Sequence, residues 1–512
     1  MNEYYYGTRD AGAAPVAGHG PTTTRPPAVI PFERRQRTLS RWPVPRDNEN
    51  LIVPLGGIGR IGMNWTLYGH AGQWILVDAG IAFPDDNMED VDAIVPDPTF
   101  LRHISDRLLG LVVTHAHEDH IGGIDRLWPG GVNCPIYATP FASTVIARRL
   151  EEVSALDDVE LNTFEVGESF VIGPFAIRTV RMTHSVPEPV ALAITTAAGT
   201  ILHTGDWKLD PNPLIGLPTD LTALKEIGDA GVTAMVCDST NANRDLPITS
   251  EADVREAFIR LFRARQGTVV VSCFATNVAR MASASVAASL SGRKIAFAGR
   301  SMRNSEEAAN ACGLLDGVPQ FLAEPRHLQG LDRRETALIC TGGQGEERAA
   351  LARLARGEGW PKLERGDTVV MSSRIIPGNE KAVEEVHSKL RQRGVEIVSS
   401  NTLVDGYPVH VSGHPGQTEL RTLYGLVRPR FGIPVHGEAE HLAAHAEIAT
   451  SMGAIVPSLS TEGEVLSVTR DGIRNLGKLQ APLLMMENDI RGNRLPYPRF
   501  SPVEAPGLAA RP

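Results

Sequence analysis

Three features of secreted, membrane-spanning or nucleic-acid-coating proteins are missing from this sequence. It has only five cysteines, none in CxxC spacing, which is typical of a protein in a reducing cytosol rather than of a disulfide scaffold. No apolar run is long enough to span a membrane, and no apolar segment follows a basic start at the N-terminus. The net charge of −10 argues against non-specific coating of nucleic acid, but it is compatible with a local basic channel. We therefore predict a cytoplasmic protein.

The length of 512 residues predicts two or three domains, and a hydrophobic content of 42% is ample for their cores. Residues 1–50 have little apolar periodicity and are rich in Gly, Pro, Thr and Arg. We predict that they form a disordered basic arm, either a solvated tail or an accessory contact for RNA. Periodicity is lost again after about residue 470, and residues 471–512 are predicted to be a C-terminal tail.

The most informative stretch is THAHEDH at residues 114–120. It follows an apolar run over 108–113, which predicts a buried strand, and it precedes a glycine pair that lets the chain turn into a helix. Alternate residues of an extended segment point the same way, so His115, His117 and Asp119 can converge. Together with His120 they offer three imidazoles and a carboxylate, which suit zinc. Groups crowded in this way repel one another unless a cation holds them.

Further candidate ligands follow predicted strands elsewhere in the chain. The strand over 175–180 leads to His184, and the apolar residues 201–202 precede Asp206. Two more strand-end histidines are His414 and His436. Each of them alone would be an ordinary turn or core residue. Their recurrence at strand ends, where ligands are held rigidly, indicates a shared site.

Two more aspartates at strand ends are predicted to support the ligands. Asp78 ends a predicted hairpin over 65–77 and can orient a ligating histidine through its free ring nitrogen. Asp238, at the end of the apolar run that starts at 235, is assigned the same supporting role. By contrast, His387, His441 and His445 lie on predicted helices, and we expect them at the surface.

The ligand candidates are enough for two metal ions about 3.5–4 Å apart. One ion would be bound by His115, His117 and His184, and the other by Asp119, His120 and His436. Asp206 would bridge the two ions. Such a pair lowers the pKa of a bound water to about 7, so hydroxide is available at neutral pH. The same site could hydrolyse a phosphodiester, an amide, an ester or a thioester, and the ligands alone do not choose among them.

Between about 246 and 410 the sequence alternates apolar strands with helices, and each strand ends in a small polar loop. This pattern predicts a parallel α/β sheet whose ligand edge is at the carboxyl ends of the strands. Backbone N–H groups exposed in such loops can hold phosphate, although any one loop could be an ordinary turn. The GGIG segment at 56–59 is interpreted as a tight turn, because no helix with Lys and Ser or Thr follows it.

These motifs are similar to those of a known family. HAHEDH, with Asp78, His184 and Asp206 at strand ends, resembles the metallo-β-lactamase superfamily. The inserted segment, with Asp238-Ser-Thr, His414 and His436, resembles its β-CASP branch, which cuts nucleic acids. Over about residues 51–470 the chain resembles the ribonuclease J family. The segments that carry this resemblance are LGGIG at 55–59, TGGQGE at 341–346, IPGNE at 376–380, VSGH at 411–414 and PVHGE at 434–438.

The resemblance implies an α/β fold, a metallo-β-lactamase αββα sandwich with an inserted β-CASP α/β domain. The first part of the metallo-β-lactamase domain would cover 51–245, the β-CASP insertion 246–410, and the second part 411–470. Residues 471–512 would form a tail in place of the family's usual C-terminal domain, which puts tetramer assembly in question.

The resemblance also implies a function. The chain would be a zinc-dependent ribonuclease with 5′→3′ exonuclease and endonuclease activity in rRNA processing and mRNA decay. It would hold two zinc ions, prefer RNA with a 5′-monophosphate, and work without a membrane, as a homodimer and with RNA-decay partners. Asp119 and Asp206 would be catalytic through the metals, and His414 would be the general acid. The implied phosphate pocket consists of His410, Val411, Ser412, Gly413 and His414.

One departure and two alternatives accompany this prediction. Arg60 stands where the family usually has an acid after the glycine-rich turn. The first alternative is a β-CASP hydrolase acting on DNA, against which His436 argues. The second is a catalytically quiet RNA-binding subunit, which is disfavoured because all seven ligand candidates are present.

Overall fold

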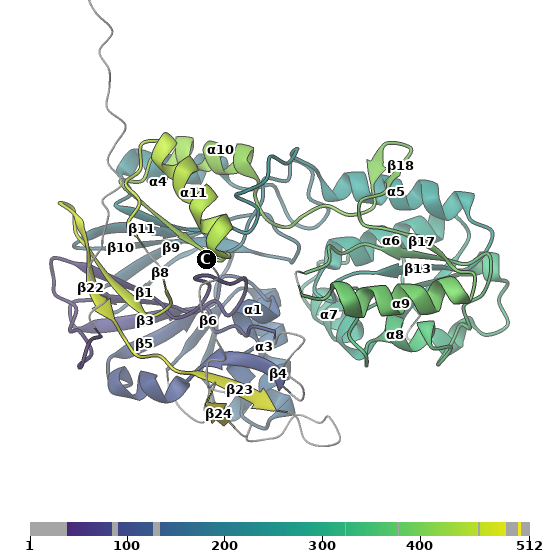
Figure 1. Ribbon diagram of the computed structural model, residues 1–512, viewed down its shortest axis with the longest axis horizontal. Coiled ribbons are helices and arrows are strands. Elements are labelled where there is room, and N and C mark those ends of the chain that lie inside the picture. Colours follow the sequence, from purple (N-terminus) through teal and green to yellow (C-terminus); the bar gives the residue numbers. More distant parts are fainter. Residues whose placement is uncertain are drawn as a thin grey trace, which may run out of the picture.

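The computed structural model describes residues 38–83, 91–125, 134–322, 324–376, 378–458, 461–487 and 500–502. In Figure 1 they form two lobes that lie side by side. The chain builds most of the first lobe, crosses to the second after strand β12, and returns before helix α10. The segments on both sides of the second lobe are therefore parts of one sandwich.

The first lobe contains two β-sheets. The larger has eight strands, in the order β22 (Ile473–Lys478), β21 (Glu464–Val468), β1 (Asn50–Pro54), β2 (Thr66–His70), β3 (Gln73–Val77), β5 (Leu108–Val112), β6 (Ile136–Ala138) and β7 (Leu161–Thr163). The smaller has six, in the order β20 (Phe431–Val435), β12 (Ala234–Asp238), β11 (Gly199–His203), β10 (Val190–Thr196), β9 (Phe175–Arg181) and β8 (Ser169–Ile172). The predicted hairpin over 65–77 is confirmed as the antiparallel pair β2–β3.

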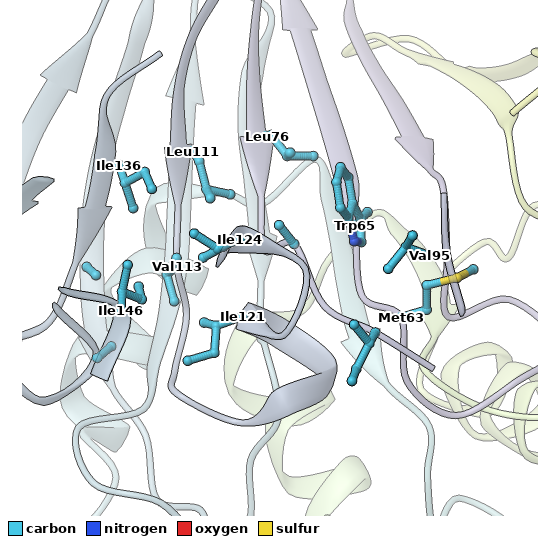
Figure 2. Packing of buried hydrophobic residues seen from close by; sticks show 14 of the residues in the cluster. Met63, Trp65, Leu76, Val95, Leu111, Val113, Ile121, Ile124, Ile136 and Ile146 are labelled. Atoms are coloured by element: carbon cyan, nitrogen blue, oxygen red, sulfur yellow. The ribbon is translucent and has the colours of Figure 1, made fainter. Parts of the chain in front are cut away.

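Alternating side chains of these strands fill two different cores. In β1, Ile52 belongs to the apolar cluster shared by the two sheets, whereas Leu51 and Val53 face the outer cluster. Figure 2 shows this outer cluster, in which Trp65 and Leu111 from the sheet meet Ile121 and Ile146 from the helical side. A cluster on the far face of the smaller sheet packs beneath α4, α10 and α11. Helices thus cover both outer faces, and the predicted αββα sandwich is confirmed.

The helices of this lobe are short to medium in length. Their bounds are α1 (Glu118–Ile121), α3 (Pro140–Glu152), α4 (Leu221–Ala230), α10 (Gln417–Val427) and α11 (Ala439–Ser451), with the 3-10 turns η1 (Pro98–Ile104) and η2 (Leu156–Asp158). Within the described ranges, no helix combines the length and hydropathy needed to cross a bilayer.

The second lobe is a five-stranded sheet in which every pairing is parallel. The strand order is β14 (Lys294–Ala298), β15 (Thr336–Cys340), β13 (Val269–Ser272), β16 (Thr368–Met371) and β17 (Glu396–Val398). One face packs on α5 (Glu251–Ala264) and α6 (Val278–Leu290), and the other on α8 (Ala350–Ala355) and α9 (Glu380–Gln392). The predicted inserted α/β domain is confirmed by this arrangement.

The remaining elements of the second lobe lie around this sheet. They are α7 (Arg300–Ala311), the turns η3 (Pro325–Leu328) and η4 (Arg333–Glu335), and the hairpin of β18 (Leu403–Val404) and β19 (Tyr407–Pro408). Helix α7 also contacts α3 of the first lobe, where Arg148 donates to the Asn304 carbonyl at 3.0 Å and pairs with Glu307 at 2.9 Å. The two lobes are therefore joined by contacts as well as by the chain crossings.

The predicted disorder of the N-terminal arm is wrong for its described part. Leu39 and Trp42 pack against the outer core of the first lobe, and the Trp42 ring stands edge-on to Trp74 with centroids 5.9 Å apart. Glu49 is buried and accepts a hydrogen bond from the Ser467 hydroxyl. Isolated apolar residues in a polar stretch give no periodicity, although each can still fill a gap at the rim of a core. Residues 1–37 lie outside the described residues.

The predicted C-terminal tail also needs correction. Strand β22 extends the larger sheet beyond β21, and β23 (Leu483–Glu487) lies between β4 (Val91–Pro96) and β24 (Phe500–Pro502) in a separate three-stranded sheet. An edge strand such as β22 buries one face at most and so shows a weaker apolar pattern than a central strand. Strand β23 pairs with β4, which is far away in the sequence, and local periodicity does not show such a partner. Residues 488–499 and 503–512 lie outside the described residues.

Candidate metal centre

The predicted ligands lie on loops that leave the carboxyl ends of strands, as expected. His115 and His117 follow β5, and His184 follows β9. Asp206 follows β11, and His436 follows β20 directly. The local conformation around 119 differs from the prediction, because α1 begins at Glu118 inside the motif. Asp119 therefore reaches the site from a helical turn rather than from an extended strand.

The first predicted group of ligands is brought together. The Nε2 atoms of His115 and His184 each lie 3.8 Å from Oδ2 of Asp206. Nδ1 of His117 lies 3.2 Å from Nε2 of His115 and 2.9 Å from Nε2 of His184. One candidate ligand atom from each of these four residues lies within 4.8 Å of all the others.

The second predicted group meets on the other side of Asp206. Its Oδ2 lies 3.2 Å from Nε2 of His120, and its Oδ1 lies 2.8 Å from Nδ1 of His436. Asp119 Oδ2 lies 3.2 Å from Nε2 of His436 and 3.7 Å from Nε2 of His120. These four side chains also offer ligand atoms within 4.8 Å of one another. Asp206 is common to both groups, which is the position of the predicted bridge.

Hydrogen bonds at the back of the rings leave lone pairs facing the centre. His184 donates from Nδ1 to the Gly413 carbonyl at 2.6 Å, and His120 donates from Nδ1 to Asp78 at 2.7 Å. In the neutral form of each ring, such a bond keeps the proton on Nδ1 and leaves Nε2 to bind a metal. Nε2 of His436 is buried, and its 3.2 Å approach to Oδ2 of Asp119 lacks the geometry of a hydrogen bond. Bare nitrogens and carboxylates packed in this way fit a metal cofactor.

The charges in the cluster indicate the same kind of occupant. Burial, reinforced by the neighbouring imidazoles, holds the pKa of His115 and of His184 well below the usual range, and burial lowers the pKa of His117 to about 4. Burial opposes ionisation of Asp206, but His436 and His120 outweigh it and hold its pKa well below the usual range. The neutral imidazoles of the first group beside the ionised Asp206 are the protonation states that bind a cation. Burial also lowers the pKa of His120 and of His436, but Asp206 and the other carboxylates outweigh burial and hold both pKa values well above the usual value, so a bound metal would displace a proton from each of these rings.

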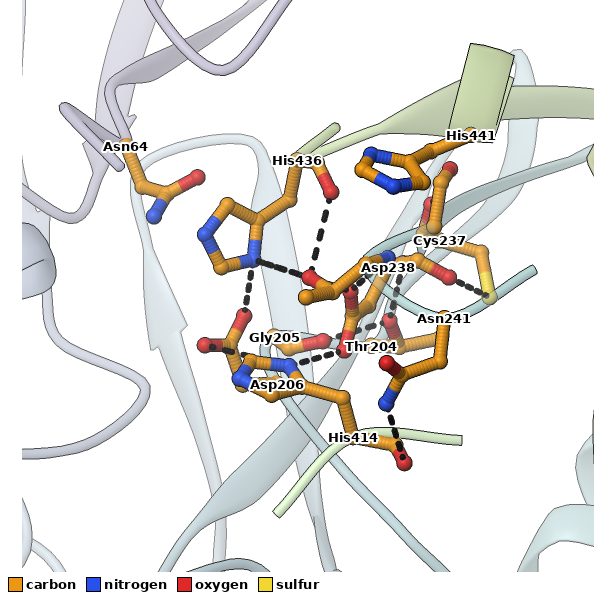
Figure 3. Close-up of polar contacts among 12 residues, drawn as sticks. Asn64, Thr204, Gly205, Asp206, Cys237, Asp238, Asn241, His414, His436 and His441 are labelled. Carbon is orange, nitrogen blue, oxygen red and sulfur yellow. Dashed lines mark hydrogen bonds and ion pairs between the residues drawn. The ribbon is translucent and has the colours of Figure 1, made fainter. Parts of the chain in front are cut away.

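His414 takes a different position from the other histidines. Its Nδ1 donates to Oδ2 of Asp238 at 2.8 Å, while Asp206 Oδ2 is 3.9 Å away. Figure 3 shows His414 and His436 converging on the carboxylates of Asp206 and Asp238. The His414 side chain is 22% exposed, against 2% or less for those of His184 and His436. Burial lowers its pKa, but Asp238 outweighs burial and raises it above the usual value.

Backbone geometry shows how closely the loops must approach. Asp78 and His436 have φ angles of 60° and 54°, in the left-handed region that few non-glycine residues adopt. A Cβ on Gly80 would lie only 1.6 Å from the Asp119 carbonyl oxygen, so glycine is required there. A Cβ on Gly413 would lie 2.7 Å from Cε1 of His184, so the close approach that forms the His184–Gly413 hydrogen bond requires glycine. Strained residues at ligand positions are typical of functional sites.

The segment predicted as a phosphate pocket runs along the junction of the lobes. Asn241 donates from its side chain to the Ser412 hydroxyl at 2.9 Å and to the His414 carbonyl at 3.2 Å. Nδ1 of His410 lies 3.4 Å from Nη1 of Arg280, a residue of the second lobe. Val411 belongs to the core of that lobe. The pocket residues therefore lie between the ligand loops and the inserted sheet.

The prediction that His441 and His445 lie at the surface is wrong, since both are buried. Nδ1 of His445 is 2.8 Å from the Ser239 hydroxyl, and its Nε2 is 3.0 Å from the Tyr424 hydroxyl. Ser239 follows Asp238 directly, so this buried network supports the loop that orients His414. His387 is half-buried on α9.

Sequence reasoning also missed Asn64, whose side-chain amide donates to the Asp119 carbonyl at 3.1 Å and lies 2.9 Å from Nε2 of His120. Figure 3 shows it beside His436. It follows the glycine-rich turn, and no pattern of charge or spacing distinguishes it. Asn241 was missed for the same reason, although its place just after the Asp238 strand end was a usable signal.

Comparison with known proteins places three parts of the chain. Residues 73–224 match the model of a beta-lactamase superfamily domain. Residues 266–390 match the ribonuclease J beta-CASP domain, and residues 407–457 match the Zn-dependent metallo-hydrolase RNA specificity domain. The three matches follow the chain in the order of the first lobe, the second lobe and the return to the first.

Relatives that match over most of their length show the same similarity. Ribonuclease J of Sinorhizobium meliloti is 42% identical over 82% of this chain and 74% of its own length. Ribonuclease J of Mycolicibacterium smegmatis is 41% identical over 78% of this chain and 71% of its own length. Ribonuclease J 1 of Streptococcus pyogenes is 35% identical over 85% of this chain and 77% of its own length.

Among solved structures, a protein of unknown function from Enterococcus faecalis shares the fold. It superposes with a TM-score of 0.55 at 15% identity, covering 82% of this chain and 100% of that one. Identity at this level speaks for the fold alone. The long relatives at 35–42% identity and the matching domain models decide the family. This chain belongs to the ribonuclease J family.

Proposed function

We propose that this chain is a two-zinc ribonuclease that removes nucleotides 5′→3′ from RNA with a 5′-monophosphate and also cuts RNA internally, in RNA processing and decay. Family membership makes it a metal-dependent nuclease. The proposal adds the metal, the number of ions, the direction and the preferred end. The observation that carries it is the convergence of imidazole and carboxylate ligand atoms within 4.8 Å in the two predicted groups, which share Asp206. A third group, Asp206, Asp238, His414 and His436, meets the same limit beside them.

In the proposed site each group would hold one ion, and Asp206, which belongs to both groups, would be a ligand of either ion. The first group is His115, His117 and His184, and the second is Asp119, His120 and His436. The hydrogen bond to Asp78 orients Nε2 of His120 toward the ion, and the bond to the Gly413 carbonyl does the same for His184. Bound there, divalent cations supply Lewis acidity toward the scissile phosphate and make water a nucleophile at neutral pH. Asp119 and Asp206 act through this binding.

His414 is the proposed general acid. Its Nδ1 donates to Oδ2 of Asp238, with 2.8 Å between the two atoms. This bond fixes the ring and leaves Nε2 for a second partner. Because Asp238 raises the pKa of His414 against the effect of burial, the imidazolium is available to protonate the leaving 3′-oxygen. Its partial exposure lets substrate reach it, unlike the enclosed ligand histidines.

Substrate recognition is proposed to run through residues 410–414, with backbone N–H groups and the Ser412 hydroxyl directed at a 5′-phosphate. Contacts to phosphate carry no base information, so weak sequence preference is expected. We also propose domain boundaries at 245/246 and 410/411, supported by the chain crossings between the lobes. A cytoplasmic location is supported by five cysteines that form no disulfide. The proposed homodimer would double the 55.2 kDa mass in light scattering.

The test uses one sequence synthesised as 5′-monophosphorylated RNA, 5′-hydroxyl RNA and 5′-monophosphorylated DNA, each labelled at the 5′ end. The purified chain is incubated with each substrate as isolated, with a chelator, and with zinc restored. We expect labelled mononucleotide from the monophosphorylated RNA, slower release from the hydroxyl RNA, and none from DNA. Chelation should stop cleavage, and zinc should restore it.

Other results would replace the proposal. RNA binding without cleavage under every metal condition would indicate a catalytically quiet RNA-binding subunit. Cleavage of DNA alone would indicate a DNA hydrolase. Cleavage that continues after the metal has been removed would refute the metal mechanism.

A further inference from the structure

One arginine of the second lobe is enclosed completely. Arg280, near the start of α6, has an exposed fraction of 0%. Its guanidinium grips Glu251 with two hydrogen bonds, from Nε to Oε2 at 3.0 Å and from Nη2 to Oε1 at 2.8 Å. Burying a charged pair takes two ions out of water, and such a pair is weak evidence for stability alone. The partners of the third guanidinium nitrogen, Nη1, indicate another role for this buried pair.

The remaining nitrogen, Nη1, reaches the segment next to the proposed phosphate pocket. It donates to the Ser372 carbonyl at 2.7 Å and to the Ser372 hydroxyl, and it lies 3.4 Å from Nδ1 of His410. The Ser372 hydroxyl in turn donates to the carbonyl of Val409. Arg280 thus fastens the end of β16 to the residues that lead into 410–414.

Glu251 is held from the opposite side by the first lobe. Its backbone N–H donates to Oδ2 of Asp210 at 2.9 Å, and Nζ of Lys208 is 2.9 Å from the same oxygen. Lys208 and Asp210 are 3% and 2% exposed. Both lie on the loop that begins with the bridging Asp206. A continuous buried chain of polar contacts therefore joins the ligand loop to the pocket segment.

The signs of these charges indicate what the chain of contacts does. It contains two cations, Lys208 and Arg280, and two anions, Asp210 and Glu251. Because the formal charges cancel, the network adds little attraction for a phosphate. Arg280 itself has no exposed surface with which to touch one. What the network can supply is position, since an arginine fork fixes two partners at once and a lysine does not.

We propose that Arg280, gripped by Glu251, is a positioning residue that fixes the 410–414 pocket at a set distance from the metal ligands, so that a 5′-phosphorylated end is cleaved in preference to other RNA. The inference rests on the proposed function, because it assigns the origin of that function's end preference. Internal cleavage does not use a 5′ end. It needs the metal centre and His414, whose ring is held by Asp238 and not by Arg280. A displaced pocket should therefore weaken end selection and spare internal cutting.

The experiment compares Arg280→Lys with a matched control. Arg293 is another buried arginine of the second lobe, 4% exposed, and it donates to the carbonyls of Gly267 at 2.7 Å and Thr336 at 3.1 Å. Arg293→Lys removes a similar buried fork away from the pocket. A second test variant, Glu251→Gln, loosens the grip on Arg280 while keeping the side-chain shape. Thermal unfolding is recorded for every variant.

Two rates are measured on the metal-loaded full chain. One is the ratio of cleavage of 5′-monophosphorylated to 5′-hydroxyl linear RNA, and the other is the cleavage of a circular RNA without ends. In Arg280→Lys or Glu251→Gln we expect the ratio to fall about tenfold or more, because small misplacements of a bound end are expensive in rate. Circular RNA should be cut within about twofold of the wild-type rate, since its cleavage needs no bound end.

The control decides between positioning and general stability. Arg293→Lys should keep the wild-type ratio even where its unfolding temperature falls as far as that of Arg280→Lys. A full end preference in both Arg280→Lys and Glu251→Gln would overturn the inference, and so would an equal loss on linear and circular RNA. A wild-type chain that cuts no RNA would instead refute the proposed function, so the two failures can be told apart.

Discussion

At the scale of the residue, His414 and Asp238 separate chemistry from metal binding. His414 bonds to Asp238 and belongs to neither of the two predicted ligand groups, so its removal leaves those groups complete. It does belong to a third set of possible ligands, with Asp206, Asp238 and His436, so its role has to be tested. We predict that His414→Asn slows RNA cleavage about 100-fold or more, the usual contribution of a general acid. Zinc content measured by mass spectrometry should be unchanged. A variant that has lost zinc would show that His414 is a ligand instead.

The buried network behind Asp238 gives a second prediction at this scale. In Tyr424→Phe, Nε2 of His445 loses its partner at 3.0 Å inside the core. An unpaired buried polar atom costs about 1–3 kcal/mol, so the free energy of unfolding should fall by that amount. Denaturant titration of the metal-loaded chain measures it. Tyr407→Phe, at a half-buried position, is the control, and an equal effect in both variants would contradict the role given to His445.

Single residues differ in how far the sequence could reveal them. The seven ligand candidates could be found because they are polar residues that follow apolar strands closely, in a chain where such endings recur. His445 could not, because its partners Tyr424 and Ser239 are 21 and 206 residues away and its own helix shows only an ordinary pattern. Arg280 has partners 29 and 92 residues away and no local signal at all.

At the scale of the element, the glycine-rich loop explains where the unusual Arg60 belongs. The loop touches the residue after His436, since the Gly437 N–H donates to the Gly57 carbonyl at 3.3 Å. Nε of Arg60 lies 2.8 Å from Oε1 of Glu462, just before β21. The ion pair thus fastens the loop to the second part of the sandwich. An acid at position 60 would repel Glu462 in this chain.

This pair predicts a pH dependence of stability. Burial raises the pKa of Glu462 to about 7, although Arg60 and Lys478 pull it down. The stabilisation from the protonated form is full below the usual value of 4.5 and is lost as the pH rises through about 7. Glu462→Gln mimics the protonated form and should not lose this stabilisation. The unfolding free energy of the wild type should therefore fall, relative to that of Glu462→Gln, by about 2 kcal/mol between pH 5 and pH 8. Equal pH profiles for the two chains would contradict this.

Elements were predictable in proportion to how much of them is buried. Strand β5 is a continuous apolar run inside its sheet, and the sequence located it at 108–113. Strand β22 lies at the edge of the larger sheet, and β23 lies in the middle of a small one whose partners come from distant parts of the chain. Pairing there depends on those partners rather than on composition, and both strands were taken for tail. The packing of Trp42 on Trp74 was hidden for the same reason, because it depends on a gap in a distant core.

At the scale of the whole molecule, the packing of residues 38–49 predicts that two N-terminal truncations differ in their effect. Deletion of residues 1–37 should leave catalysis and stability unchanged. Deletion of residues 1–49 also removes Trp42 and Glu49, and should lower the unfolding free energy by about 2–4 kcal/mol through the lost apolar contact. Thermal unfolding of the two truncated chains tests this. Equal stability of the two would contradict the packing of 38–49.

The central claim is that side chains from distant strand ends form one cage for a pair of cations around Asp206. Its most direct test is the metal content of the folded chain, purified without chelator and measured by mass spectrometry beside His117→Ala and Asp206→Ala. We predict two zinc ions per wild-type chain, a clear loss in His117→Ala, and the largest loss in Asp206→Ala, which removes the shared ligand. A folded wild-type chain that stays free of metal after dialysis against zinc would contradict the account.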